Sequence, residues 1–281
     1  MKTILSLLMV FSIATHAQEG KTAAQYIDNI ITATKAAEIP DTNDVIKEGN
    51  PNTIVTGIAT CMFATMEVLQ KAVEAKCNLI ITHEPLYYNH KDDTGFFKGD
   101  AVYEEKKKFI LDHGLVVWRF HDYIHSIQPD GIMTGTIKKL GWEKNLVAGS
   151  GYFFDFPEQT LEQFLAGLKA TFPDQAFHVV GNPKMKLTHV AYAPGASGTN
   201  RHITALRMPN VDVVVAGEVP QWETYEYVRD AVTQGKNKAI IFIGHINSEE
   251  SGMEYCKEWL QAFISDVPIH FIPCKSSYWT Y

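Results

Sequence analysis

Four predicted strands of this chain each end on a side chain that can bind a metal ion. The apolar runs and the residues that follow them are 79–82 before His83 and Glu84, 115–120 before His121, 211–217 before Glu218, and 239–244 before His245. Short β-branched runs spaced by helical segments are typical of parallel strands in an α/β sheet, and ligands gather at the carboxyl ends of such strands. Imidazoles and carboxylates that converge at one sheet edge favour a shared metal site.

A histidine that follows one strand is, taken alone, more often a surface or hydrogen-bonded side chain than a metal ligand. Here the pattern repeats, and further potential ligands stand just downstream. Asp122 and His125 follow His121, and Glu249 follows His245. This density of groups that bind divalent ions predicts a metal centre built from several strand ends.

The elements that must position these residues form two successive rounds of helices and strands. In the first round, we expect helices at 22–37, 64–75, 101–113 and 131–140, and strands at 53–59, 78–82 and 115–120. In the second round, we expect strands at 152–156, 177–180, 188–193, 211–215, 239–243 and 269–272, and helices at 160–171, 201–208, 222–233 and 249–264. Right-handed crossovers make such sheets largely parallel. The sequence therefore predicts an α/β fold of two similar halves, 18–145 and 146–281, with mixed, largely parallel sheets and the metal site in the crevice between them.

The amino end has the pattern of a secretory signal. Lys2 precedes an apolar stretch at 4–13, and small residues follow up to Ala17, so we expect cleavage near Ala17 and an exported, periplasmic protein. The alternative is the amphipathic first helix of a cytosolic protein, but the polar residues of the stretch do not form one face. A bilayer span needs about 20 apolar residues, so we expect no membrane span.

Charge and cysteine content exclude other classes of protein. The net charge is −7 and no basic block exceeds 106–108, so we expect no nucleic-acid partner. Cys61 and Cys77 bracket a predicted helix that separates them by about 24 Å, which is beyond disulfide reach. A bond between Cys256 and Cys274 stays open, although we expect mostly buried free thiols.

The glycine-rich segment 194–199, Pro-Gly-Ala-Ser-Gly-Thr, connects an expected strand to an expected helix. Backbone amides in such a segment can cradle an anion, although the lysine of a P-loop is absent. A plain tight turn is the alternative interpretation.

With these residues in hand, the chain resembles the dinuclear-metal, hexameric protein family labelled GTP cyclohydrolase 1 type 2, which is NGG-interacting-factor-like. Residues 82–86, Thr-His-Glu-Pro-Leu, resemble the family's [Thr/Val]-His-His-Pro-Leu segment. Residues 244–249 are similar to its Gly-His-x-x-[Ser/Thr]-Glu motif, and residues 215–218 resemble its Thr-Gly-Glu stretch. The order and spacing match over roughly residues 54–273.

The resemblance implies two divalent ions, of zinc, iron, manganese or nickel, in an α/β fold that assembles as a homo-hexamer. It implies these metal ligands: His83, Glu84, His125, His245 and Glu249. Glu84 stands where the family usually has histidine and His125 where it usually has aspartate, so three imidazoles and two carboxylates are preserved. Because an imidazole binds one ion whereas a carboxylate can bridge two, Glu84 or Glu249 must take the bridging role together with water.

Groups around these ligands complete the expected site. His121 and Asp122 are candidates to fix the orientation of a ligating imidazole. His90 and Asp92 either line the cleft or belong to a solvated loop. Aromatic residues that could anchor contacts between subunits are Trp222, Tyr225, Tyr227, Tyr278 and Trp279.

Two functions from different classes fit this pattern. The first is a metal-dependent hydrolase of a small polar or phosphorylated molecule, because a dinuclear site activates water and stabilises a developing oxyanion. Glu218 or Glu249 would transfer the proton. The second is a non-catalytic ring that stores, senses or delivers metal. A serine hydrolase and a dinucleotide enzyme are disfavoured, because the Gly-x-Ser-x-Gly and Gly-x-Gly-x-x-Gly motifs are absent.

Overall fold

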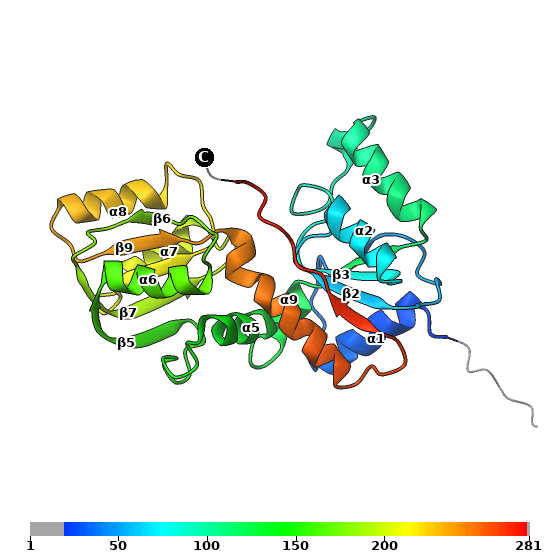
Figure 1. The fold of residues 1–281 in the computed structure, drawn as a ribbon, viewed down its shortest axis with the longest axis horizontal. Coiled ribbons are helices and arrows are strands. Elements are labelled where there is room, and N and C mark those ends of the chain that lie inside the picture. The colour runs from blue at the N-terminus through cyan, green and yellow to red at the C-terminus, as the bar shows by residue number, and fades with distance from the viewer. Residues whose placement is uncertain (1–19, 280–281) are drawn as a thin grey trace, which may run out of the picture.

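The computed structural model describes residues 20–279. It contains two α/β bodies, each with a five-stranded sheet, joined by two long helices (Figure 1). The predicted signal segment, including Lys2 and the cleavage position at Ala17, lies outside the described residues. Within the described part of the chain, no helix combines the length and the apolar character needed to cross a bilayer.

The first sheet is mixed and largely parallel, with strand order β1-β4-β3-β2-β10. Its strands are β1 (Ile46–Glu48), β2 (Ile58–Cys61), β3 (Leu79–Thr82), β4 (Val116–Arg119) and β10 (Ile269–Phe271). Only β1 runs antiparallel to its neighbour, β4. Alternate side chains of β3 face opposite layers: Ile81 packs toward α1 (Ala23–Thr34), whereas Ile80 packs toward α2 (Met66–Glu74) and α3 (Ala101–Asp112).

The second sheet repeats this plan with strand order β5-β7-β8-β9-β6. Its strands are β5 (Phe153–Thr160), β6 (His178–Val180), β7 (Lys186–Ala193), β8 (Val213–Ala216) and β9 (Ala239–Phe242), and the two edge strands are antiparallel to their neighbours. Helix α6 (Leu161–Thr171) packs on one face, while α7 (Thr199–Leu206) and α8 (Thr224–Thr233) cover the other. The prediction of an α/β fold with mixed, largely parallel sheets is confirmed.

Helices α5 (Gly131–Leu140) and α9 (His245–Gln261) cross between the two bodies (Figure 1). Their backbones approach closely because each helix has a glycine where the two cross. A Cβ atom on Gly135 would lie 2.2 Å from the Ser251 carbonyl oxygen, and one on Gly252 would lie 2.5 Å from the Ile132 Cα. Larger residues at either position would push the bodies apart.

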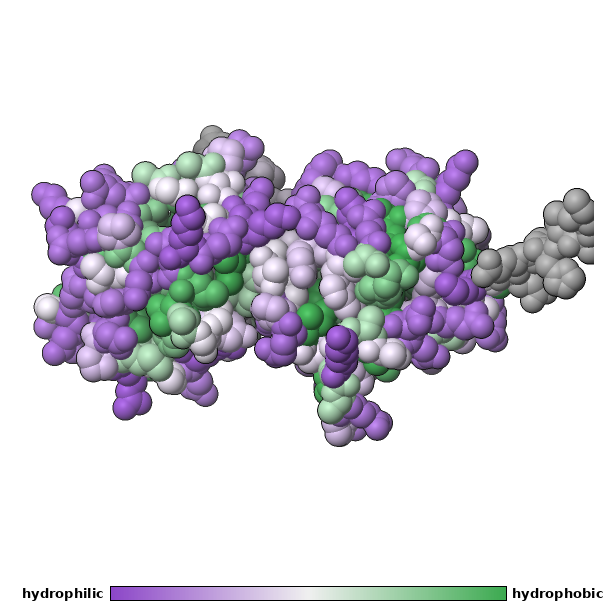
Figure 2. All heavy atoms as spheres, turned by 90° about the horizontal axis from the view of Figure 1, so that it is seen from below, coloured by the Kyte–Doolittle hydropathy of each residue, from purple (hydrophilic) through white to green (hydrophobic). Residues whose placement is uncertain are grey.

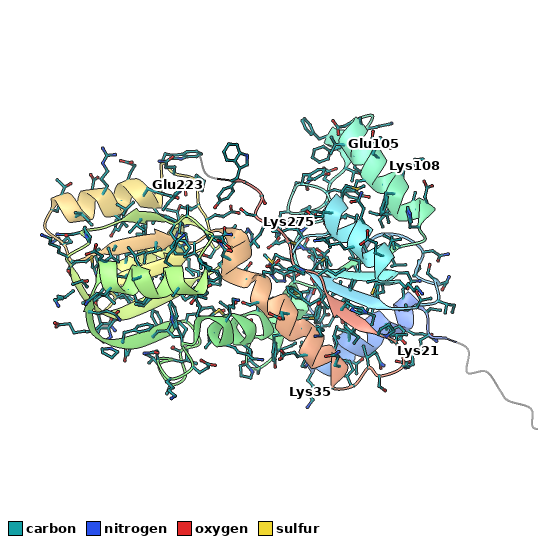
Figure 3. All side chains as sticks on the ribbon, in the orientation of Figure 1. Lys21, Lys35, Glu105, Lys108, Glu223 and Lys275 are labelled. Atoms are coloured by element: carbon teal, nitrogen blue, oxygen red, sulfur yellow. The ribbon has the colours of Figure 1, made fainter. Side chains whose placement is uncertain are left out.

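Helix α9 carries the chain back to the first body. It starts after β9 of the second sheet, and its Met253 and Leu260 are buried in the core of the first. The expected strand at 269–272 therefore exists as β10, but it pairs in parallel with β2. A helix of 17 residues spans about 25 Å, which is enough to cross between the sheets. The C-terminal segment then returns between the bodies, where Lys275 is paired with Glu67 at 2.7 Å (Figure 3).

Local differences from the expected elements bear on the site. Helix α9 begins at His245, four residues before the expected start, and a short helix α4 (Asp122–Ser126) follows β4. The sequence did not predict α4 or β1, because elements of five and three residues carry little periodicity. All four cysteines are free thiols, including Cys256 and Cys274.

Candidate metal centre

The potential ligands gather at the carboxyl end of the first sheet, where α9 crosses from the second body. His83 and Glu84 follow β3 directly, and Glu249 lies on the second turn of α9. These three side chains are buried, and each offers a donor atom within 4.8 Å of the other two. One cluster therefore combines residues that follow β3 with a residue of α9, the helix that connects the two bodies.

A second group shares His83. His121, His125 and His83 also bring one nitrogen each within 4.8 Å of one another. His121 is the N-cap residue of α4 and His125 lies within that helix, with their ring centroids 5.0 Å apart. The rings of His83 and His121 are stacked with centroids 4.6 Å apart. His121, expected from sequence to orient a ligand, is thus placed as a candidate ligand itself.

The state of His83 fits a metal ligand. Its Nδ1–H donates to the Phe120 carbonyl oxygen at 3.3 Å, which leaves the lone pair on Nε2. That Nε2 atom is buried and has no hydrogen-bond partner among residues 20–279. Burial, and then the neighbouring His121 and His125, hold the pKa of His83 well below its ordinary value, so the ring is neutral. An unpartnered buried acceptor is costly unless a ligand occupies it, and a neutral imidazole is the form that binds metals.

His245 connects the carboxylates of the cluster. Its Nε2 lies 3.0 Å from Glu84 Oε1 and 3.0 Å from Glu249 Oε2, the latter four residues along α9. Its Nδ1–H donates to Glu218 Oε1 at 2.8 Å. Burial opposes the charged ring, but these three carboxylates raise the pKa of His245 to about 12. Without a metal ion, the His245 ring therefore carries a proton on both nitrogens and is positively charged.

Two aspartates fix the histidines of α4. Asp122 Oδ1 accepts a hydrogen bond from His121 Nδ1 at 3.0 Å, and its Oδ2 accepts one from the Asn43 amide. Asp130 Oδ2 accepts one from His125 Nδ1 at 2.9 Å. Burial opposes the His125 cation, but the bond with Asp130 raises its pKa overall. In both rings Nε2 is left free for an ion, which is the usual arrangement for ligating histidines.

Sequence reasoning missed two of the supporting carboxylates. Asp44 accepts backbone hydrogen bonds from His121, Asp122 and Tyr123 and so caps α4. Asp130 also accepts from the Met133 amide and caps α5. A capping signal directly before Gly131 was available for Asp130, whereas nothing in the local sequence of Asp44 indicates its partner.

Three other sequence interpretations have outcomes in the structure. His90 is exposed, and Asp92 is paired with Lys47 at 3.2 Å and accepts from the Tyr87 amide, so both organise a loop. The 194–199 segment is a turn whose Gly195 amide donates to Ser248 Oγ at 2.9 Å. A Cβ atom on Gly195 would lie 2.6 Å from Glu249 Oε1, so this glycine makes room for the Glu249 carboxylate.

A cavity of about 390 Å³ adjoins the cluster on the side of the second body. Its walls include His245 and Glu218 together with four aromatic side chains: Phe63, Tyr225, Phe242 and Tyr278. Tyr225 stacks on Phe242 at 4.3 Å, and His178 Nδ1 lies 3.1 Å from the Tyr225 hydroxyl. The exposed edge of the site is therefore open to a small molecule with both apolar and polar groups.

Comparison with known proteins identifies a family and several related proteins that share one description. Residues 19–277 match the Duf34/NIF3 (NGG1p interacting factor 3) family. A Clostridium acetobutylicum protein described as a GTP cyclohydrolase 1 type 2 homolog is 27% identical over 212 residues, which are 72% of this chain and 75% of that protein. A Clostridium perfringens protein of the same description is 24% identical over 205 residues, which are 69% of this chain and 74% of that protein.

Solved structures share the fold. A hypothetical protein of Staphylococcus aureus superposes with a TM-score of 0.73 at 18% identity, covering 93% of this chain and 99% of that one. A Bacillus cereus protein related to NIF3 gives 0.70 at 15% identity, covering 92% and 98%. At such identities the likeness shows the arrangement of the two α/β bodies.

Proposed function

This chain belongs to the Duf34/NIF3 family, and from that premise we propose that it is a dinuclear metal-dependent hydrolase of a small polar or phosphorylated molecule. The observation that carries the proposal is His83 Nε2, a buried nitrogen without a hydrogen-bond partner that points into a cluster of imidazoles and carboxylates. If the cluster bound no ion, this buried acceptor would destabilise the fold and nothing would offset that loss.

The donor set divides naturally between two ions. His83 has one free nitrogen and can bind one ion only, because its Nδ1 is engaged by Phe120. In our proposal His83, His121 and His125 hold one divalent ion. Glu84, Glu249 and His245 hold the other, with His245 giving up its Nε2 proton. Mixed imidazole and carboxylate ligands accommodate zinc, iron, manganese or nickel.

Glu249 is our candidate for the bridging carboxylate. Its Oε2 lies 3.0 Å from His245 Nε2 in one group and 3.8 Å from His83 Nε2 in the other. It therefore stands between the two donor sets, and a carboxylate has oxygens for two ions. Gly195, packed against its Oε1, keeps the Glu249 side chain in this position.

The remaining residues prepare the chemistry. Two divalent ions in such a site supply an activated water and stabilise negative charge that develops on a substrate. Glu218 holds the His245 ring through Nδ1 while 57% of its side chain remains exposed at the cavity. The bond from His245 lowers the pKa of Glu218 against the effect of burial, so its carboxylate is ionised at neutral pH. We propose that Glu218 transfers the proton between water and leaving group, and that the aromatic walls orient the substrate.

The alternative is a metal-binding protein without turnover. The cavity beside His245 and Glu218 favours the enzyme, because a site that only stores metal needs no pocket. Hydrolysis of phosphoesters, nucleotides and cyclic amides, measured with and without chelator, separates the two functions. The enzyme predicts chelator-sensitive turnover that falls at least about a hundredfold in Glu218→Gln with the metal retained. Two bound ions with no turnover on any substrate class support the alternative.

We also propose that the protein is exported and forms a homo-hexamer. The proposal of export rests on the apolar stretch at 4–13, and amino-terminal sequencing of the mature protein should give Gln18.

The proposal of a hexamer draws on the exposed aromatic surface. Trp222 is 76% exposed at the second body, whereas Tyr225 is half-buried against Phe242 and lines the cavity. Hydrophobic areas lie between polar ones on both bodies in the view from below (Figure 2). Such surfaces suit contacts between subunits.

A further inference from the structure

A fully buried arginine stands beside the cluster. Arg119 is the last residue of β4, and its side chain has no exposed surface. Its Nε–H donates to the His83 carbonyl oxygen at 3.2 Å, and its Nη1–H donates to the His90 carbonyl oxygen at 2.6 Å. Arginine cannot lose its proton in a protein, so a full positive charge lies inside the molecule. A buried charge of this kind requires a compensating partner.

Glu84 is that partner. Arg119 Nη2 lies 3.5 Å from Glu84 Oε2, an ion-pair distance, although this Nη2 atom makes no hydrogen bond within the described part of the chain. The other oxygen, Oε1, lies 3.0 Å from His245 Nε2. The two oxygens of one carboxylate therefore face different groups. Oε2 faces a permanent cation, and Oε1 faces the donor atoms of the metal centre.

We propose that Arg119 is a positioning residue of the metal centre, an inference that rests on the proposed function. It holds Oε2 of Glu84, so only Oε1 of Glu84 would face an ion. Its charge also cancels that of Glu84, so the pair presents to the ion about the charge of a neutral ligand. Glu249 then supplies the remaining uncompensated carboxylate of this donor set.

Because the charges of Arg119 and Glu84 cancel, the effect of replacing one of them on metal binding should depend on whether the other is present. If Glu84 is replaced by a neutral ligand, the Arg119 cation faces the bound ions without compensation. Removing the cation as well restores the balance. Co²⁺ alone serves as the probe, because its absorption spectrum reports the ligands that surround it. The four proteins are the wild type, E84H, R119Q and E84H/R119Q. The control is R229Q on α8, because Arg229 is exposed and paired with Glu226.

We expect E84H to weaken the binding of Co²⁺ at the affected position at least about tenfold. R119Q added to E84H should recover about the same factor. In the wild-type chain, R119Q frees the charge of Glu84 but also removes the contact that holds its Oε2, so the two effects offset and binding should not strengthen. R229Q should change nothing. A purely structural role for Arg119, through the His83 and His90 carbonyls, would weaken binding equally in both backgrounds. Equal effects of R119Q in the wild-type chain and in the E84H chain overturn the inference.

Two further outcomes keep the tests separate. If R119Q does not fold, R119K replaces it: the retained charge should keep wild-type binding within about threefold and should give E84H no recovery. Recovery in E84H/R119K overturns the inference. A wild-type chain that binds no Co²⁺ refutes the metal centre itself, whereas two bound ions with additive effects refute only the role of Arg119.

Discussion

Metal binding should expel a proton from His245, and its affinity should therefore rise steeply with pH. In the metal-free protein Nε2 of His245 carries a proton shared between Glu84 and Glu249, and the three surrounding carboxylates raise the pKa of the ring to about 12. An ion can bind Nε2 only after this proton leaves. Because the pKa lies far above neutrality, the proton is present throughout the ordinary working range.

The size of the pH dependence follows because one proton leaves His245 for each ion that binds there. Below a pH of about 12 the apparent dissociation constant of the ion at His245 should fall about tenfold per pH unit, or about a hundredfold between pH ~6.5 and ~8.5. Neither His83 nor Glu84 adds a further proton to this dependence, because burial lowers the pKa of His83 and the bond from His245, against the effect of burial, lowers that of Glu84. Both are already in the ligating form.

The assay is calorimetric titration of metal-free protein with Zn²⁺ in two buffers of different ionisation enthalpy. The difference in heat gives the number of protons released, and we expect about one or more per chain near neutral pH. Glu218→Gln removes one of the carboxylates that raise the His245 pKa, so the pH above which the affinity levels off should fall. Affinity that stays constant across this pH range, with no proton released, would refute the role of His245.

The same proton has the opposite effect on the metal-free fold. The pKa of His245 is raised from 6.5, so its contribution to stability is fully present below pH 6.5 and declines as the pH rises toward 12. The metal-free protein should therefore lose part of its free energy of unfolding above neutral pH, while the metal-loaded protein gains affinity for its ions.

Three further results are expected. His83→Ala and His245→Ala should each remove at least one ion per chain, because each takes away a donor nitrogen; elemental analysis that finds two ions in both variants would show the ligands to be misassigned. Gly195→Ala should weaken metal binding about tenfold or more by crowding Glu249, whereas Gly198→Ala, with nothing within 4 Å of the added Cβ, strains its turn without reaching the site; equal losses in the two variants would remove the role of Gly195. Sedimentation should show a hexamer at micromolar concentration, and a monomer alone would contradict the proposed assembly.

Much of the candidate site could be predicted from the sequence because its residues follow strands. His83, Glu84, Glu218 and His245 each come directly after a buried apolar run, and parallel strands bring their carboxyl ends together. The grouping of His121 with His83 and His125 could not be predicted. No helical periodicity surrounds His121 in the sequence, whereas in the structure it caps the five-residue helix α4 that carries His125.

Other features depend on tertiary contacts that leave no local trace. Strand β10 has three residues, and only the path of α9 decides that it joins the first sheet. Asp44 acts through amides that lie 77 to 79 residues away in the chain. Arg119 ends strand β4 without any local sign of its role, and only the tertiary contact with Glu84 shows what its charge compensates.

The metal content of the wild-type chain tests the central claim most directly. We propose measuring anomalous X-ray scattering from crystals of protein reconstituted with Zn²⁺, which locates each ion and its ligands. The account predicts two ions per chain, one beside His83, His121 and His125 and one beside Glu84, Glu249 and His245. A structure in which His83 Nε2 remains without an ion, or in which zinc lies only outside this cluster, would contradict it.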